Sequence, residues 1–467
     1  MKKTVDQFPA GLISIPPSKS AAHRALICAA LAARAEQGAD QGADAAADAL
    51  AASVGLSLAG ASEDVRATAE GIAAIAKNWG RGGEVDCGES GSTLRFLAPV
   101  AAMSGGEWAF TGRGRLLARP MGIYAELFEA RGALFEHTAE AGGRIRVKGP
   151  LPAGEYRLPG DVSSQFITGL LLALPLALPD GGIRESALTL TTALESADYV
   201  KLTLEVMRAF GASAESNRGS NLACGADLPS YTIPAGQRYA APPGGRRIEG
   251  DWSQAAFFLC AGALGAAVSV AGLDSGSLQG DRRVLDILAQ MGAEISWEGA
   301  TVRARPPASG RLRGITICAR DIPDIVPPLA ALACFAEGET RFTGAGRLRF
   351  KESDRLAALA GELSKLGAGI IETPDGLIIR GQPPGRAEGA RPQTSGDPAA
   401  PKPPGWRTAE ASAHGDHRIA MALAVFAVAA DCRVVIDGAE SVAKSYPDFW
   451  EDFGKNSGKD LGKDERP

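Results

Sequence analysis

The sequence predicts an α/β protein built from repeated subdomains that form two lobes. Its 467 residues are enough for two or three domains with full hydrophobic cores. A helical segment, a Gly-Ala pair and two short strands joined by a turn recur four times. The copies lie roughly 80 residues apart, which is far longer than a solenoid period. They occur on both sides of the middle of the chain, which favours two lobes of similar construction.

The four clearest copies of this repeat show the expected periodicities. In the third copy, the apolar residues from Val284 to Met291 have helical spacing, and residues 294–297 alternate as in a strand. Each unit has one apolar helix face and one apolar sheet face, so several units must pack together. We therefore expect a cleft between the two lobes. The Gly-Ala pairs of the four copies are Gly132-Ala133, Gly211-Ala212, Gly292-Ala293 and Gly367-Ala368.

Six stretches place hydroxyl or basic residues where an apolar helical run is expected to begin. A helix N-terminus offers N–H groups and partial positive charge to phosphate or carboxylate. Ser, Thr and Asp are also the usual N-caps, so each single stretch has a purely structural explanation. Lys or Arg in the same turn opposes the helix dipole, however, and its recurrence indicates anion binding. The stretches are 17–20, 91–95, 163–165, 351–355, 416–418 and 443–445.

Composition excludes several classes of function. The chain carries 49 basic and 54 acidic residues, and a net charge of −5 argues against nucleic acid or an anionic membrane as a bulk partner. Seven scattered cysteines without CxxC pairs are typical of reduced thiols in a cytoplasmic protein, and the polar residues after Met1 argue against a secretory signal. The four histidines lack partners at ligand spacing, so we expect no metal site. The apolar run 255–273 predicts a buried helix followed by a strand.

Taken in order, the chemical motifs resemble the 5-enolpyruvylshikimate-3-phosphate (EPSP) synthase family. Each motif alone is weak, but the ordered set is specific and extends from about Ile13 to Phe449. The family moves the enolpyruvyl group of phosphoenolpyruvate onto shikimate 3-phosphate. The strongest matches are Pro17-Ser18-Lys19-Ser20 with Arg24, Ser62-Glu63-Asp64-Val65, Gly88 to Arg95, Arg119-Pro120, Ser163-Ser164-Gln165, Lys351 to Arg355, Asp416-His417-Arg418 and Lys444 to Asp448.

The resemblance implies a fold and a domain organisation. The family has a two-lobed inverse α/β barrel (the enolpyruvyl transferase fold) with six βαβαββ repeats, three in each lobe. We expect residues 1–18 and 248–467 to form lobe I and residues 19–247 to form lobe II. Residues 35–52, a short helix or a flexible loop, and the Pro- and Gly-rich residues 383–407 are interpreted as insertions. We expect residues 455–467 to be a disordered tail, and the protein to be a monomer without a cofactor.

The resemblance also implies which residues hold each substrate. Arginine suits phosphoenolpyruvate because its planar fork binds carboxylate or phosphate with two hydrogen bonds. For shikimate 3-phosphate, the matching residues are Lys19, Ser20, Arg24, Ser163, Ser164, Gln165, Ser196, Asp324 and Lys351, with Tyr199 in the same segment as Ser196. For phosphoenolpyruvate, they are Lys19, Gly91, Arg119, Gln165, Arg355, Arg418 and Lys444.

The implied reaction needs a base and an acid. The 5-hydroxyl of shikimate 3-phosphate loses a proton as it attacks C2 of phosphoenolpyruvate, and the C3 methylene gains one. By resemblance, Asp324 is the base and Glu352 the proton donor, while Lys19 competes for part of this transfer. Asp324 follows Pro323 and has an alternative interpretation as an N-cap, which is compatible with catalysis.

Three positions depart from the commonest family pattern. Glu89 stands where many members have Asn, Ser92 replaces Thr, and Arg347 occupies a position that is Asn in some members. A carboxylate near an anionic substrate is repulsive unless a cation such as Arg119 pairs with it. His417 is expected to line the site, with packing as the alternative interpretation.

Two other functions remain alternatives. A sister transferase acting on UDP-N-acetylglucosamine shares the fold, but would be expected to carry Lys-Asn where this chain has Lys19-Ser20, and commonly a Cys before Arg119. A catalytically silent metabolite-binding relative would need neither Asp324 nor Glu352. An NAD-binding interpretation fails because GxGxxG is absent. The substrates expected as partners are therefore phosphoenolpyruvate and shikimate 3-phosphate.

Overall fold

The computed structural model describes the chain except residues 6, 37–42, 139–141, 219–227, 383–405 and 455–467. The predicted disordered loop and tail therefore fall almost wholly outside the described residues. Of the first predicted insertion, residues 43–53 form a helix, which agrees with one of its two interpretations.

The chain divides into two compact units. Unit 1 contains Met1–Pro16, Gly250–Ser277 and Asp281–Pro467. Unit 2 contains Pro17–Glu249 and a short return, Leu278–Gly280. The expected boundaries at residues 18/19 and 247/248 lie two residues from the observed divisions. The assignment of residues 278–280 to unit 2 was not expected from the sequence.

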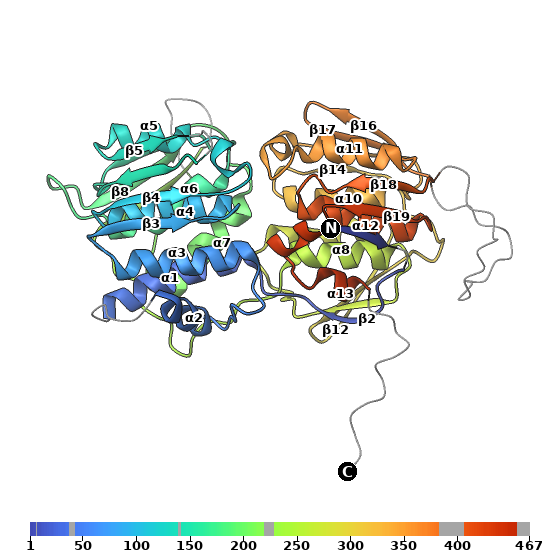
Figure 1. Ribbon diagram of the computed structural model, residues 1–467, viewed down its shortest axis with the longest axis horizontal. Helices are drawn as coiled ribbons and strands as arrows, with labels where there is room; N and C mark the ends of the chain where they lie inside the picture. Colours follow the sequence, from blue (N-terminus) through green and yellow to red (C-terminus); the bar gives the residue numbers. More distant parts are fainter. Residues whose placement is uncertain (6, 37–42, 139–141, 219–227, 383–405, 455–467) are drawn as a thin grey trace, which may run out of the picture. The chain divides into compact units, whose positions relative to one another are not determined.

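The elements of each unit are coloured along the sequence in Figure 1. Unit 2 contains α1 (Lys19–Glu36), α2 (Ala43–Ser53), α3 (Glu63–Lys77), β3 (Gly82–Asp86), α4 (Gly91–Met103), β4 (Glu107–Thr111), η1 (Leu116–Ala118), α5 (Gly122–Ala130), β5 (Leu134–His137), β6 (Ile145–Lys148), β7 (Glu155–Leu158), α6 (Ser164–Ala173), η2 (Leu174–Leu176), β8 (Glu185–Leu190), α7 (Ala197–Ala209), β9 (Glu215–Arg218) and β10 (Pro229–Pro234).

Unit 1 begins with two strands and continues in the second half of the chain. Its elements are β1 (Lys2–Val5), β2 (Gly11–Ser14), α8 (Trp252–Ala263), β11 (Val268–Ala271), η3 (Gly280–Arg283, which starts at the last residue of the return), α9 (Val284–Gln290), β12 (Glu294–Glu298), β13 (Thr301–Arg305), β14 (Thr316–Cys318), η4 (Pro323–Ile325), α10 (Val326–Ala333), β15 (Glu339–Thr343), η5 (Gly346–Phe350), α11 (Arg355–Lys365), β16 (Gly369–Thr373), β17 (Gly376–Arg380), β18 (Ala409–Ser412), α12 (His417–Ala429), β19 (Val434–Asp437), η6 (Ala439–Lys444) and α13 (Phe449–Phe453).

Four sheets repeat one plan. Their strand orders are β3-β4-β6-β5, β7-β8-β10-β9, β2-β11-β13-β12 and β14-β15-β17-β16. In each sheet the first two strands are parallel, and the last two form an antiparallel hairpin. A helix precedes the second strand in each case, although unit 2 also lies between β2 and β11 in the chain. This plan contains the helix, Gly-Ala pair and hairpin that the sequence pattern predicts, and it agrees with the βαβαββ repeat that the resemblance implies. A fifth sheet, β1-β19-β18, has three strands. The described part of the chain thus contains five sheets, whereas the resemblance implied six repeats. The described residues between Pro17 and Asn78 form the helices α1, α2 and α3 and no strand.

The Gly-Ala pairs mark the same corner in each repeat. Gly132, Gly211, Gly292 and Gly367 each follow a helix and have positive φ angles between 69° and 104°. Left-handed backbone of this kind favours glycine, and it turns the chain from the helix into the hairpin. The repeat visible in the sequence is therefore a repeated helix C-terminus.

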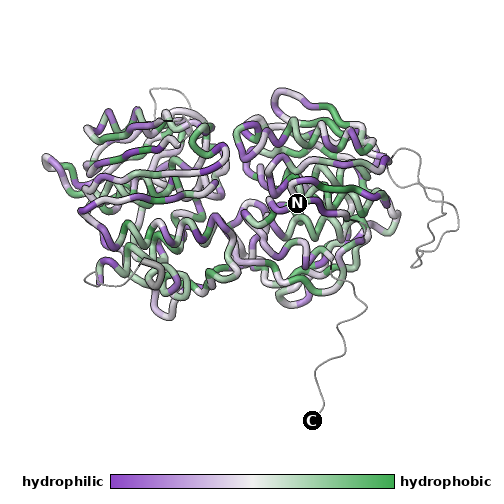
Figure 2. The backbone as a smooth tube through the Cα atoms, in the orientation of Figure 1, coloured by the Kyte–Doolittle hydropathy of each residue, from purple (hydrophilic) through white to green (hydrophobic). Residues whose placement is uncertain are grey.

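Completely buried helices form the cores. Every residue of α8 and α10 is buried, as expected for helices that are apolar all round, and Figure 2 shows these central segments as largely hydrophobic. The predicted buried helix and strand in 255–273 are confirmed as α8 and β11. None of the helices in the described ranges is both long and apolar enough to cross a membrane.

One expected helix start and one expected core thiol are wrong. Lys444 is the last residue of η6 and does not begin a helix. The stretch 351–355 does contain a helix start, because Asp354 is the N-cap of α11 and accepts a hydrogen bond from the amide of Ala357. Cys318 is exposed, because it lies on the outer face of β14.

The close approach of α4 and α6 gives a stability prediction. A Cβ on Gly169 in α6 would lie 2.2 Å from the carbonyl oxygen of Arg95 and 2.3 Å from the Tyr124 hydroxyl. We expect Gly169→Ala to destabilise the protein by about 1–3 kcal/mol through overpacking. Gly361→Ala in α11 is the matched control. Its Cβ meets nothing within 4 Å, and we expect a gain of about 0.5–1 kcal/mol. Thermal unfolding of both variants measures the difference in stability, and equal melting temperatures for Gly169→Ala and Gly361→Ala would contradict the expected overpacking.

Candidate active site

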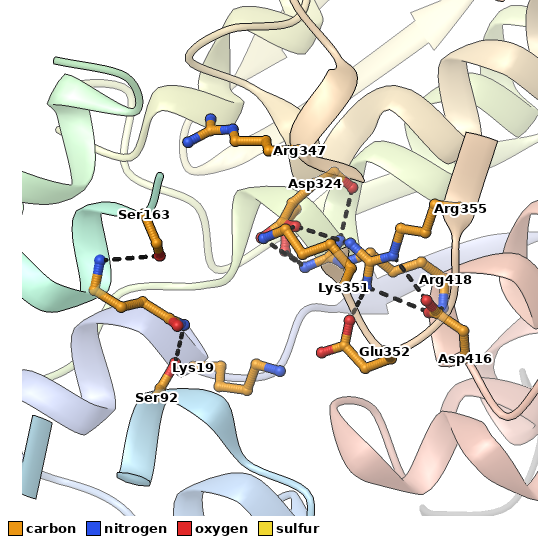
Figure 3. Close-up of polar contacts among 12 residues, drawn as sticks. Lys19, Ser92, Ser163, Asp324, Arg347, Lys351, Glu352, Arg355, Asp416 and Arg418 are labelled. Carbon is orange, nitrogen blue, oxygen red and sulfur yellow. Dashed lines mark hydrogen bonds and ion pairs between the residues drawn. The ribbon is translucent and has the colours of Figure 1, made fainter. Parts of the chain in front are cut away.

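Arg355 is the centre of the polar cluster in unit 1. It is the first residue of α11, and its side chain is 1% exposed. Its guanidinium donates hydrogen bonds to three carboxylates (Figure 3). Two bonds go to Asp416, from Nε at 2.8 Å and from Nη2 at 3.3 Å. Nη1 donates to Asp324 at 3.1 Å, and Nη2 donates to Glu352 at 2.7 Å. Burial alone would lower the pKa of Arg355, but the carboxylates of Asp416, Glu352 and Asp324 raise it above its usual range. One fixed cation thus holds three acids.

Asp416 fixes this guanidinium and also begins α12. It is completely buried, is the N-cap of α12 and accepts from the amide of Arg418 at 2.9 Å. It also accepts from the Ser353 hydroxyl at 3.1 Å. Two bonds join it to Arg355, whereas Asp324 and Glu352 have one each. Asp416 is therefore the carboxylate that holds the Arg355 guanidinium with the most hydrogen bonds.

Asp324 lies among three cations. Besides Arg355, its carboxylate is 3.3 Å from Nη2 of Arg418 and 3.6 Å from Nζ of Lys351. Nη1 of Arg418 donates to the backbone carbonyl of Asp324 at 2.8 Å, and Nη2 donates to the Ser253 hydroxyl at 3.0 Å. Asp324 lies within η4 rather than at the N-cap of α10, so its side chain serves the cluster.

Lys351 and Lys444 complete the basic side of unit 1. Burial lowers the pKa of Lys351 below that of an ordinary lysine, although the neighbouring carboxylate of Asp324 opposes this effect. Nζ of Lys444 donates to the carbonyl of Gly415 at 2.9 Å, next to Asp416. His417 is buried, with Nδ1 3.9 Å from the Asp416 carboxylate. Arg347 contacts the carbonyl of Arg320 through Nη2.

In unit 2, the N-terminal ends of α4 and α6 come together. Ser92 and Gln165 are the residues of these two helices that are not buried. Nε2 of Gln165 donates to the Ser92 hydroxyl at 2.9 Å, and its Oε1 accepts from Nη1 of Arg95 at 2.6 Å. Arg95 also donates to the carbonyl of Pro120 and lies over the Phe166 ring. Arg95 thus fixes which way the Gln165 amide faces.

Serine and lysine side chains surround these helix ends. Ser163 is the N-cap of α6 and accepts from the amide of Gln165 at 3.3 Å, while Ser164 is buried in its first turn. Lys19 begins α1, and its Nζ is 2.9 Å from the carboxylate of Asp64 in the first turn of α3. Ser196 precedes α7 in left-handed backbone with φ 56°. A serine rarely adopts this conformation, which is typical of functional segments.

Arg24 is a buried cation that contacts only neutral groups in the described part of the chain. Its guanidinium donates to the hydroxyls of Thr203 at 2.8 Å and Thr168 at 3.2 Å. It also donates to the carbonyls of Ser20 at 2.6 Å and Tyr199 at 3.1 Å. Burial lowers the pKa of Arg24 to about 10, so it remains charged at neutral pH. An uncompensated buried cation attracts an anionic ligand.

Gly91 allows Arg119 to lie close to the start of α4. A Cβ at Gly91 would lie 2.6 Å from Nη1 of Arg119, so a larger residue would displace the guanidinium. The carboxyl group of Glu89 lies beside Gly114, where an added Cβ would be 2.9 Å away. His23 hydrogen-bonds the buried Thr68 at 2.6 Å, and burial lowers its pKa well below the usual range, which is consistent with a structural role.

Comparisons with known proteins agree on one family. The sequence model of EPSP synthase (3-phosphoshikimate 1-carboxyvinyltransferase) matches residues 7–453. The 3-phosphoshikimate 1-carboxyvinyltransferase of Clostridium kluyveri is 39% identical over 459 residues, covering 94% of this chain and 93% of the relative. That of Clostridium acetobutylicum is 37% identical, with the same coverage.

This chain belongs to the EPSP synthase family.

Solved structures support the enolpyruvyl transferase fold. EPSP synthase from Acinetobacter baumannii superposes with a TM-score of 0.62 at 25% identity, covering 97% of each chain. An enolpyruvyl transferase from Streptomyces tendae gives a TM-score of 0.62 at 16% identity, covering 97% of this chain and 96% of the other. This second similarity is evidence for a common fold and for nothing more. The two-lobed α/β fold expected from the resemblance is therefore confirmed.

The site residues expected of an EPSP synthase fall into two groups. In unit 1, contacts join Asp324, Lys351, Glu352, Arg355 and Arg418 directly, and Lys444 contacts the turn before Asp416. In unit 2, contacts join Gln165 to Ser92 and Ser163, and Arg24 to Ser20. Sequence reasoning gave no role to Asp416, Asp64 or Arg95. All three lay within quoted motifs, but their partners are distant in the sequence.

Removing Arg355 should leave three carboxylates without their common cation. We expect Arg355→Leu to destabilise unit 1 by about 3–5 kcal/mol, as breaking buried ion pairs does. Arg341→Leu on β15 is the control, because Arg341 is 48% exposed and pairs only with Glu339 in the described part of the chain. There we expect a loss of about 0–1 kcal/mol. Thermal unfolding measures both variants, and a similar loss in the two would contradict the central role of Arg355.

Proposed function

We propose that the two groups of residues together catalyse enolpyruvyl transfer from phosphoenolpyruvate to the 5-hydroxyl of shikimate 3-phosphate, with release of phosphate. The chain is a transferase of the EPSP synthase family, which acts in aromatic amino acid biosynthesis. The observation that carries the proposal is the attachment of two carboxylates, Asp324 and Glu352, to different nitrogens of one buried arginine. A silent binding protein has no use for such a pair of acids.

The basic residues of each unit suit the two anionic substrates. Arg355, Arg418 and Lys444 in unit 1, with Arg119 and Lys19 in unit 2, are assigned to the carboxylate and phosphate of phosphoenolpyruvate. Four of the five N–H groups of Arg355 already contact carboxylates. The substrate would therefore compete with Asp324 and Glu352 for this guanidinium.

Shikimate 3-phosphate is assigned to the remaining residues. Arg24 supplies buried positive charge, and the hydroxyls of Ser163, Ser164 and Ser196 are suited to phosphate oxygens. Gln165, fixed by Arg95, presents its amide beside Ser92. Asp324 and Lys351 would then act on the 5-hydroxyl.

Two proton transfers define the mechanism. Asp324 takes the proton of the 5-hydroxyl as this oxygen attacks C2 of phosphoenolpyruvate, and Glu352 gives a proton to C3. The product is a tetrahedral intermediate whose C3 is now a methyl group. In the second step Glu352 takes a proton back from C3 as the C–O bond to phosphate breaks, and the phosphate leaves with the proton that Asp324 had taken. Lys19 is assigned to anion binding, and its Nζ lies 2.9 Å from the carboxylate of Asp64.

The Lys19-Ser20 pair favours shikimate 3-phosphate over UDP-N-acetylglucosamine as the acceptor. The carbonyl of Ser20 accepts from Arg24, and the ammonium of Lys19 faces Asp64. The sister transferase would be expected to have Asn in place of Ser20. A further expected difference is a cysteine before Arg119, and residues 113–118 contain none.

Phosphate release from purified protein tests this function. We expect release with phosphoenolpyruvate and shikimate 3-phosphate, and none with UDP-N-acetylglucosamine. Glu352→Gln and Asp324→Asn should each lower kcat by about 10²–10⁴-fold, because each removes a proton-transfer group. Glu298→Gln is the control, since Glu298 is 65% exposed on β12 and pairs with Arg303. Absence of release with either acceptor, despite tight binding of phosphoenolpyruvate, would contradict the proposal.

The lowered pKa of Lys351 predicts the alkaline limit of substrate binding. The ammonium form binds the anionic substrate, and it is lost as pH rises through a pKa below the usual 10.5 of lysine. Affinity for shikimate 3-phosphate should therefore fall at a lower pH than an ordinary lysine would give. In the Lys351→Arg variant, this fall in affinity should occur at higher pH, because arginine stays charged. Titration calorimetry between neutral and alkaline pH measures the affinity for shikimate 3-phosphate in both proteins. The same decrease in affinity at the same pH in wild type and in Lys351→Arg would contradict the role of Lys351.

A further inference from the structure

A strained turn lies immediately before the N-cap of α12. The amide of Asp416 donates to the carbonyl of Ala413 at 2.8 Å, and the two central residues, His414 and Gly415, have φ angles of 52° and 65°. Positive φ at both central positions defines a type I′ turn. Glycine adopts this backbone readily, but a histidine at the first position costs conformational energy. Something must hold His414 in place.

Glu362 supplies that contact from α11. It is 2% exposed, and its Oε1 lies 2.7 Å from Nε2 of His414. Its Oε2 accepts from the amide of Ser412 at 3.0 Å, and Lys365 donates to both oxygens. Burial would raise the pKa of Glu362, but its contacts with Lys365, Ser412 and His414 together lower it below the usual value. The carboxylate therefore holds both ends of the segment 412–414.

The same helix also binds the other end of the turn. Arg355 and Glu362 are seven residues apart, two turns of α11, and therefore lie on one face. Arg355 binds Asp416 at the end of the turn, and Glu362 binds Ser412 and His414 at its beginning. The carbonyl of Gly415, between them, accepts from Lys444. The position of this turn thus determines where Asp416 and Lys444 lie.

We propose that Glu362 and His414 are positioning residues for the phosphoenolpyruvate-binding group of unit 1. They hold the 413–416 turn against α11, so that Asp416 orients Arg355 and Gly415 orients Lys444. Neither residue touches the reacting atoms. The inference rests on the proposed function, because it assigns Arg355 and Lys444 to phosphoenolpyruvate.

Substitutions in the turn and in Glu362 test this proposal. His414→Gly removes the contact and also relieves the backbone strain, so the protein should fold, with KM for phosphoenolpyruvate raised about tenfold and kcat changed less. Glu362→Ala should raise KM at least as much. Glu362→Gln keeps an acceptor oxygen for the amide of Ser412, and its NH₂ group can donate to Nε2 of a neutral His414, so KM should remain within about threefold of wild type. Glu205→Ala is the stability control, because it removes a residue of α7 that pairs with Arg246. It should lower the melting temperature without changing KM.

Hydrogen–deuterium exchange gives a second readout that does not depend on turnover. His414→Gly and Glu362→Ala should speed exchange in residues 412–418, and Glu205→Ala should leave it unchanged. Lower melting temperatures with unchanged KM and unchanged local exchange would overturn the proposal and leave a purely structural contact. If the wild-type protein releases no phosphate, the proposed function fails. In that case exchange alone decides whether Glu362 and His414 hold the turn.

Discussion

The buried guanidinium of Arg355 is the interaction on which the rest of unit 1 depends. Hydrogen-bonded counter-charges stabilise a cation this deeply buried, and Asp416, Asp324 and Glu352 supply them from three different segments. The same bonds therefore join the starts of α11 and α12 to η4. The bonds that satisfy this arginine therefore also bring Asp324 and Glu352, the two carboxylates proposed to act in proton transfer, to the same guanidinium.

Unit 2 balances charge in a different way. Arg24 is equally buried, but its contacts in the described residues are hydroxyls and carbonyls, which leave its positive charge uncompensated. A ligand with a phosphate and a carboxylate is the natural complement of such a cation. The helices that carry Ser92 and Gln165 are otherwise buried, so their N-terminal ends are the parts able to meet a ligand. One unit thus supplies acids held by a cation, and the other supplies positive charge.

The repeats, and many of the residues that the structure joins in the two polar groups, could be predicted from the sequence for physical reasons. Helix C-terminal glycines and alternating strands are local signals, so Gly132, Gly211, Gly292 and Gly367 marked the repeat correctly. Side-chain partners are not local: Arg355 meets Asp416 across 61 residues and Gln165 meets Arg95 across 70. Lys444 was wrongly placed at a helix start because a basic residue after apolar ones is equally compatible with the end of a 3₁₀-helix. Strain at His414 is a backbone property with no sequence signature.

In the proposed mechanism, the acid and base of unit 1 drive an addition followed by an elimination. This mechanism can be tested by running the reaction in D₂O and following the vinyl methylene of the product by NMR. Because C3 becomes a methyl group in the intermediate and then loses one hydrogen, we expect deuterium in that methylene. Product formed at a normal rate without deuterium would contradict it, since C3 would never have been protonated.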